Sequence, residues 1–236
     1  MKKAIDAPAK PRGRPRSFDR DVALESALNV FWKHGYEATS LCDLTAAMGI
    51  NPPSLYAAFG DKEQLFMEAI DRYAERRRQA LAPIYEQEPT ARGAIERVLM
   101  RAVEELSQPG TPRGCMLVLS AINCADASAH IQSALAERRA ASRARLKARI
   151  DRAVKEGELA ADTDTAALAD FYTAVLQGMS HRARDGASRK SLIATAQTAL
   201  RAWPQSARKS VRKTKAEAPS QRAKIDGSLC AHASRR

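Results

Sequence analysis

The side chains best suited to covalent or acid–base chemistry in this sequence are its cysteines and histidines. They are Cys42, Cys115, Cys124, Cys230, His34, His130, His181 and His232. No histidine stands near a cysteine in a recognisable catalytic motif, and the patterns G-x-x-x-x-G-K-[ST], G-x-S-x-G and H-E-x-x-H are missing. We therefore predict that the protein is not an enzyme and needs no cofactor. An enzyme with a cysteine nucleophile is the alternative.

Cys115 and Cys124, with His130 as a third ligand, suggest a metal site. If one helix covers 115–124, however, the two sulfur atoms lie on opposite faces and about 13 Å apart along the axis. We therefore predict no metal site, and a buried, apolar cysteine is the default interpretation. Thiol or soft-metal sensing stays open. Cys115 would then react first, because it stands at an expected helix start beside Arg113.

Basic side chains are concentrated at the two ends of the chain. The 236 residues carry a formal net charge of +12. Residues 1–20 hold seven basic and two acidic side chains, residues 204–236 hold nine and two, and residues 21–203 hold 23 of each. Such basic ends attract polyanions, chiefly nucleic acid and secondarily anionic lipid. With no C-x-x-C pair, no apolar run near 18 residues and no secretory signal, we expect a cytoplasmic protein without membrane contact.

The elements that position these side chains are expected to be helices. From Ser17 to about Trp203 the pattern is helical, and alternating β-branched strand signals are missing. The first helix is predicted over about 19–34. Asp19 is its expected N-cap and Gly35 the residue after its end.

Two short helices are predicted next. Ser40 and Asp43 have the form of a capping box before the second helix, which Gly49 closes. Asn51 caps a third helix over 52–59, whose first two residues are prolines. A helix followed by two short helices with a tight glycine turn is the helix-turn-helix arrangement, whose last helix enters the DNA major groove. A plain helical bundle is the alternative that spacing alone leaves open.

The residues themselves carry a more specific signal than the spacing. The relevant runs are FWKHGYEATS at 31–40 and INPPSLYAAFGDKEQL at 50–65. Through them, residues 17–76 closely resemble the TetR/AcrR family of bacterial transcriptional regulators. The rest, to about Trp203, resembles the family's second domain in helix count and length. ComR-like repressors are the most similar subgroup, through Arg12–Pro15, Gly114-Cys115, Gln177–Ser180 and Leu200–Pro204.

This resemblance implies an all-α homodimer with an N-terminal three-helix helix-turn-helix domain and a C-terminal helical effector-binding and dimerisation domain. The expected divisions are a flexible basic arm (1–16), a DNA-binding domain (17–77), a ligand-binding and dimerisation domain (78–203) and a disordered basic tail (204–236). The implied function is sequence-specific repression at a palindromic operator in double-stranded DNA. A small-molecule effector, which the sequence does not identify, would release the operator.

The residues expected at DNA are Arg14, Arg16, Thr39, Ser40, Asn51, Pro53, Ser54, Tyr56, Ala57 and Lys62. The resemblance places Thr39, Ser40, Tyr56 and Lys62 against phosphates, which helix N-termini and lysines commonly bind. Pro53, Ser54 and Ala57 are the candidates for base edges. The family often has an aromatic residue and histidine where Ala57-Ala58 stand, so readout is expected to use methyl contacts and Ser54. Arg14 and Arg16 are expected in the minor groove or at phosphates.

The expected effector contacts are Cys115, Leu119, Cys124 and Phe171. The C-terminal region is poor in aromatic residues, which favours an aliphatic pocket or a small polar effector over an aromatic cage. Small residues in 163–183 and 188–203 predict a four-helix dimer interface. A nonspecific nucleic-acid-compacting protein is the alternative function. The neutral region at 21–203 argues against it, because compaction needs no such helical domain.

Overall fold

The computed structural model describes residues 18–204. The predicted all-α class is confirmed, since this range is helical and contains no strand. Its α-helices are α1 (Arg20–His34), α2 (Leu41–Met48), α3 (Pro52–Phe59), α4 (Lys62–Gln87), α5 (Ala91–Leu106), α6 (Met116–Leu119), α7 (Ala129–Lys155), α8 (Thr165–Arg184) and α9 (Arg189–Arg201). A short 3-10 turn, η1 (Asp126–Ser128), precedes α7. The predicted arm at 1–16, with Arg14 and Arg16, and the tail beyond Pro204 lie outside the described residues.

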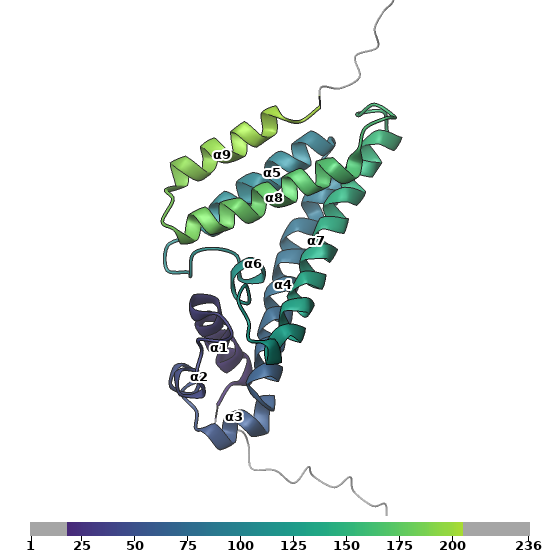
Figure 1. Cartoon of the computed structure of the whole chain (residues 1–236). Helices are drawn as coiled ribbons and strands as arrows, with labels where there is room; N and C mark the ends of the chain where they lie inside the picture. The colour runs from purple at the N-terminus through teal and green to yellow at the C-terminus, as the bar shows by residue number, and fades with distance from the viewer. Residues whose placement is uncertain (1–17, 205–236) are drawn as a thin grey trace, which may run out of the picture.

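The helices form two groups joined by a long pair (Figure 1). Helices α1, α2 and α3, with the start of α4, form one end, which we call the head. Helices α5, α8 and α9 form the other end, and with the adjoining parts of α4 and α7 we call them the body. Helices α4 and α7 pack against each other between the two ends, and the short α6 lies between α1 and α8 (Figure 1).

The predicted helix boundaries of the head are confirmed, and each begins at a side-chain oxygen that caps a free amide. The capping residues are Asp19, Ser40, Asn51 and Asp61. Ser40 and Asp43 make the reciprocal capping box, which satisfies two amides at once. Gly49 then ends α2 in the left-handed conformation, with φ 66°. These local bonds fix the turn between α2 and α3.

A hydrophobic core holds the three head helices on α4. Its large apolar side chains, of the kind that the sequence pattern of these helices favours as core, are each at most 5% exposed: Phe31, Leu44, Leu55, Phe59 and Leu65. Met116 and Leu117 of α6 belong to the same core. A second core joins α5, α7, α8 and α9 in the body. Because α6 packs into the head core, a displacement of α6 must disturb the head.

The prediction of one helix over 115–124 is wrong. Helix α6 ends at Leu119, and Cys124 lies in the irregular segment before η1. The Ser120 carbonyl, which a longer helix would use to accept the Cys124 amide, instead accepts the backbone N–H of Tyr36 at 2.8 Å. A tertiary contact has therefore replaced the intrahelical bond. Within residues 18–204, no group of three histidine, cysteine or carboxylate side chains is arranged to hold a metal ion.

Helix α4 passes without interruption through the predicted division at 77/78. It continues to Gln87 despite Pro83 within its last turns. The division between a domain at 17–77 and one at 78–203 stays a prediction, and α4 belongs to both. A single rigid element therefore connects the head to the body.

Candidate nucleic-acid interface and body cavity

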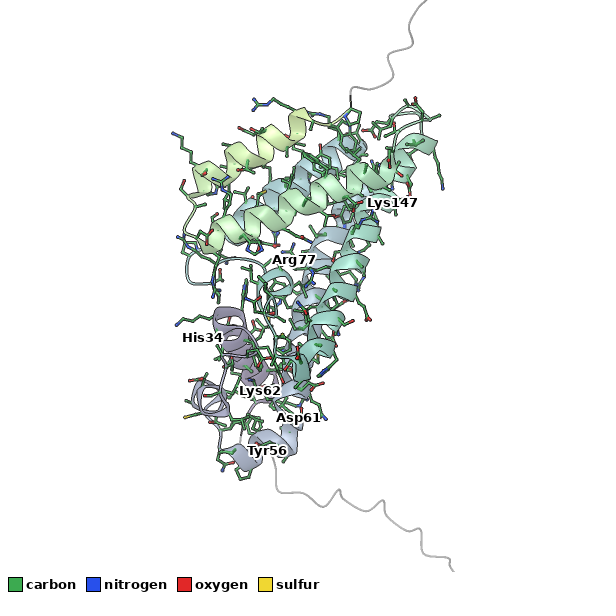
Figure 2. The ribbon with its side chains drawn as sticks, in the orientation of Figure 1. His34, Tyr56, Asp61, Lys62, Arg77 and Lys147 are labelled. Atoms are coloured by element: carbon green, nitrogen blue, oxygen red, sulfur yellow. The ribbon has the colours of Figure 1, made fainter. Side chains whose placement is uncertain are left out.

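Helix α3 turns one face inward and leaves the other at the tip of the molecule. Leu55 is fully buried, whereas Tyr56 is 50% exposed on the opposite side. Pro53 and Ala57 are also exposed and Ser54 is half-buried. Figure 2 places Tyr56 at the end of the head farthest from the body. This surface is free to enter a groove.

Two of the predicted DNA contacts are also helix caps. The Asn51 side chain accepts the Ser54 amide at 2.9 Å, and Ser40 Oγ accepts the Asp43 amide at 3.1 Å. The hydrogen bonds from Ser40 hold the pKa of the Asp43 carboxyl below its usual range. Both caps are exposed, so the starts of α2 and α3 face solvent. The first amides of a helix carry partial positive charge, which suits phosphate.

The expected phosphate contact by Thr39 is not supported. Its side chain is 1% exposed, and its hydroxyl donates to the Gly35 carbonyl at 2.6 Å. A buried hydroxyl already engaged with the backbone offers nothing to a phosphate. Thr39 instead ties the chain between α1 and α2 back onto the end of α1.

Lys62 is the first residue of α4, and its position is fixed by the segment after α1. Its Nζ lies 4.5 Å from the centre of the Tyr36 ring and 3.5 Å from the Glu37 carbonyl oxygen. Burial lowers the pKa of this lysine. Figure 2 shows Lys62 with Asp61 on the head, close to the end that carries Tyr56. Its ammonium group is therefore preorganised near the exposed face of α3.

Arg20 positions α3, a role that the sequence interpretation missed because it counted Arg20 only toward the positive charge of residues 1–20. Its Nε and Nη2 donate to the Ala58 carbonyl, both at 3.3 Å. The guanidinium stacks 4.4 Å from the Phe59 ring centre and pairs with Glu68 of α4. This pairing raises the pKa of Arg20. A contact with a residue 48 positions away leaves no local signal in the sequence.

A cavity of about 110 Å³ lies in the body. We call it the effector cavity, and α4, α5, α7, α8 and the start of α6 surround it. Its walls combine aliphatic side chains, among them Leu81, Val98 and Leu176, with five arginines. Tyr85 is the one aromatic residue that lines it among residues 18–204, and burial raises the pKa of that hydroxyl to about 12. The aliphatic character that the sequence predicted is present, together with a positive charge that it did not predict.

Of the four side chains expected to contact an effector, only Cys115 lines this cavity. Leu119 packs over Gly114, and Cys124 packs against the head core, where burial raises the pKa of its thiol. Phe171 is 40% exposed on the outside of α8. The cavity is therefore lined by Cys115 but not by the other three residues, because α6 ends at Leu119 before Cys124 and because Phe171 lies on the outer side of α8. Which residues contact an effector stays a prediction.

A run of three arginines at 76–78 is expected from its sequence to be a solvated face, but the three side chains differ from one another. Arg76 pairs with Glu25 and Arg78 with Glu75, and both are exposed. Arg77 is instead half-buried, pairs with Glu105 and lines the effector cavity. Figure 2 shows it between the head and the far end of the body. The expectation of a solvated face thus fails for Arg77.

Segment 114–120 bonds the cavity wall to the head. The backbone N–H of Cys115 donates to Ser180 Oγ of α8 at 2.7 Å, and Trp32 Nε1 of α1 donates to the Gly114 carbonyl at 2.8 Å. The Cβ that any other residue would place at Gly35 would lie 3.1 Å from the Ser120 carbonyl oxygen. Arg184, at the end of α8, donates through Nη2 to the carbonyl of Lys33 at 2.7 Å. Cavity and head are therefore connected through hydrogen bonds at both α6 and α8.

An exposed helix at the end of a helix-turn-helix head, joined to a helical body that holds a cavity, defines a helix-turn-helix regulator. Comparison with known proteins agrees. Residues 23–69 match the model for bacterial regulatory proteins of the tetR family, and residues 91–199 match that for the tetracyclin repressor-like C-terminal domain. The chain belongs to the TetR family, as the sequence resemblance predicted.

Relatives of known name match about four-fifths of this chain. The HTH-type transcriptional repressor ComR of Escherichia coli K12 is 38% identical over 197 residues, which are 83% of this chain and 94% of that protein. BdcR, a repressor of the same organism, is 35% identical over 78% of this chain and 88% of its own length. A cysteine mutant of the TetR-family regulator CifR, solved with 26-bp double-strand operator DNA, is 44% identical with TM-score 0.79. That match covers 81% of this chain and 100% of CifR. Within residues 18–204, no helix is long and apolar enough to cross a membrane.

Proposed function

We propose that this protein is a transcriptional repressor that binds a palindromic operator as a homodimer and releases it when a small molecule occupies the effector cavity. The observation that carries the proposal is the exposed face of α3 at the tip of a capped helix-turn-helix head. The named repressors among its relatives and the operator-bound CifR support it. A cytoplasmic location at the nucleoid follows from this role.

The proposed DNA contacts are of two kinds, those to phosphates and those to base edges. Lys62, Tyr56, and Ser40 and Asn51 at the helix starts would bind phosphates and fix the register of the head. The exposed methyl of Ala57, with Pro53 and Ser54, would contact base edges in the major groove. Outside the described residues, Arg14 and Arg16 would add contacts in the minor groove or at phosphates.

Effector binding would act on the head through segment 114–120. Cys115 lines the cavity and its amide is bonded to α8, while Met116 and Leu117 lie in the head core. A ligand that separates α4, α7 and α8 would therefore shift α6 and reorient α1. Because the two heads of a dimer must match two half-sites about 34–36 Å apart or a multiple of that, a small rotation of each head lowers affinity.

Genome-wide footprinting with the purified full-length protein tests this function. We expect a small number of protected sites, each with dyad symmetry. A protein that only compacts nucleic acid through its basic ends would protect DNA without a shared sequence, and that result would contradict the proposal. Genes beside the protected sites would also indicate the chemistry of the effector.

A further inference from the structure

The effector cavity combines a mostly apolar lining with a strong positive charge. Its lining contains five arginines and, among the described residues, no aspartate or glutamate. The arginines are Arg77, Arg78, Arg139, Arg143 and Arg145. Three of them pair with carboxylates that do not line the cavity: Arg77 with Glu105, Arg78 with Glu75 and Arg143 with Asp170. The other two have no ion pair within residues 18–204, so the cavity keeps an excess of positive charge.

The two arginines without ion pairs both come from α7. Arg139 donates to the Leu117 carbonyl at 2.8 Å, and Arg145 donates to Ser142 Oγ at 3.3 Å. A neutral oxygen satisfies one donor but leaves the charge of the guanidinium uncompensated. Arg145 is the more available of the two, because it is exposed and has only this one side-chain bond among the described residues.

A second cavity adjoins the first and extends its positive charge. This arginine cavity, of about 290 Å³, lies between α4 and α7 and shares Arg78, Tyr85 and Arg145 with the effector cavity. Its further charged residues are Arg149, Arg152 and Glu86. Arg145, Arg149 and Arg152 are spaced four and three residues apart, so they lie on one face of α7.

Arg149 is the independent observation that indicates a ligand here. Arg149 is only 2% exposed, and its Nη2 donates a hydrogen bond to the Glu88 carbonyl at 3.2 Å. Its Nε and Nη1 are buried and have no hydrogen-bond partner among the described residues. Leaving a buried, charged donor without an acceptor costs folding free energy. A ligand that supplied acceptors to these two N–H groups would remove that cost.

The acidic groups around Arg149 do not neutralise it. Burial and the neighbouring Arg152 lower the pKa of this guanidinium, although Glu158, Glu156 and Glu88 act in the opposite direction. The Glu158 carboxylate is occupied at the start of α5, where it accepts the amides of Ala91 at 2.6 Å and Arg92 at 3.0 Å. An incoming carboxylate would supply the missing acceptors.

Resting on the function proposed above, we infer that the cavity pair binds an organic anion, a carboxylate with an alkyl or aryl body. Its apolar part would lie among Leu81, Val98 and Leu176 in the effector cavity. Its carboxylate would lie in the arginine cavity, which Arg149 lines, and would accept hydrogen bonds from Arg149 and from Arg145, which both cavities share. Tyr85 lines both cavities and keeps its hydroxyl protonated, so it can donate a further hydrogen bond to the carboxylate.

Calorimetry on the full-length protein with matched probes tests the inference. The probes are butanoate, hexanoate and octanoate, the amides and primary amines of the same chain lengths, and inorganic phosphate. We expect a carboxylate to bind about tenfold or more tightly than the amide of the same length, because the arginines supply charge-assisted hydrogen bonds. Its affinity should fall with added salt, and the amine should bind more weakly than the amide.

Two substitutions localise the effect. Arg145→Gln and Arg149→Gln should each weaken carboxylate binding about tenfold and leave amide binding unchanged. Arg92→Gln removes the same charge from an exposed site that lines neither cavity and should change nothing. If Arg149→Gln fails to fold, Arg145→Gln still decides, since Arg145 is exposed and has no ion pair within residues 18–204.

The outcomes separate this inference from the repressor function. Equal binding of carboxylate and amide, or no binding of any carboxylate at millimolar concentration, would overturn the anion site. If inorganic phosphate bound as tightly as octanoate, the inference that the ligand has an apolar body would be overturned. Operator release is measured separately by fluorescence anisotropy of labelled DNA. If an amide releases the operator as well as the carboxylate does, the effector function is retained and the preference for an anion is contradicted. If the carboxylate binds but does not release the operator, the anion site is retained and its role as the effector site is contradicted.

Discussion

Lys62, which we propose as a phosphate contact, has a charged side chain that the protein itself holds in position. Its ammonium lies over the Tyr36 ring and near the Glu37 carbonyl, so the conformation of the side chain is already fixed in the DNA-free protein. A long side chain held in this way loses less conformational entropy on binding than a free one. Cation–π contact supplies the attraction that keeps the group in place without neutralising it.

We expect Lys62→Ala to weaken operator binding and to flatten its salt dependence. Each subunit loses one phosphate contact, so the slope of log affinity against log salt should fall by about two per dimer. Lys147→Ala is the matched control, because this lysine pairs with Asp151 on α7, well away from the head in Figure 2. Anisotropy titrations at several salt concentrations measure both. An unchanged slope for Lys62→Ala would remove this lysine from the interface.

The Ser40–Asp43 capping box gives a second prediction at this scale. Ser40→Ala should cost about 1 kcal/mol through the lost N-cap. The pKa of Asp43, held below its ordinary value of 3.8 chiefly by the Ser40 hydroxyl, should rise toward that value. Because the folded-state pKa is the lower one, the carboxylate adds stability above about pH 3.8, and this stability is lost as the pH falls.

Carboxyl NMR titration and urea unfolding measure the two effects of Ser40→Ala. Ser26→Ala is the control, because its hydroxyl donates to the Val22 carbonyl inside α1 and caps nothing. We expect Ser26→Ala to leave both the Asp43 pKa and the unfolding midpoint nearly unchanged. If Ser40→Ala did not shift the Asp43 titration, the capping box would not be formed in solution.

At the scale of helices, the range of each interaction determines what the sequence could predict. Caps such as Asn51 and Ser40 bond within three residues, so their signals are local and the helix boundaries of the head could be predicted. The end of α6 depends on Tyr36, more than eighty residues earlier, and no local pattern contains that contact. The positive cavity arises in the same way, because helices distant in sequence each contribute their arginines.

Arg184 tests whether such a long-range link carries the effector signal. It joins the end of α8 to the last carbonyls of α1, those of Trp32 and Lys33. We expect Arg184→Ala to keep operator affinity within about threefold while raising the effector concentration needed for release, because coupling between sites is typically 1–3 kcal/mol. Anisotropy of labelled operator, titrated with whichever ligand calorimetry identifies, measures both quantities.

Arg182→Ala is the matched control for that experiment. Arg182 lies in the same last turn of α8, but it bonds to Thr195 and Ser191 of α9 and not to the head. Its loss should leave both operator affinity and release unchanged. If the two variants behaved alike, the signal would not pass through the bond between α8 and α1.

At the scale of the whole molecule, α8 presents a surface that a single chain does not cover. Ala167, Phe171, Ala174 and Gly178 are all exposed, and their spacing of four, three and four residues aligns them in one stripe. Small residues let helices approach closely, and Phe171 adds apolar area. Two copies related by a two-fold axis could bury this stripe against each other and place both heads on one side.

A charge within the stripe should therefore separate the copies. We expect Ala174→Arg to give a monomer by light scattering at micromolar concentration, because two arginines would meet near the two-fold axis without acceptors. Operator affinity should fall on the order of a hundredfold, since each head then binds its half-site alone. Ala136→Arg, an equally exposed position on α7, should remain dimeric and bind normally. A wild-type monomer would contradict the dimer itself. A dimeric Ala174→Arg protein would show that another surface joins the subunits, and the spacing of the heads would then have to be set elsewhere.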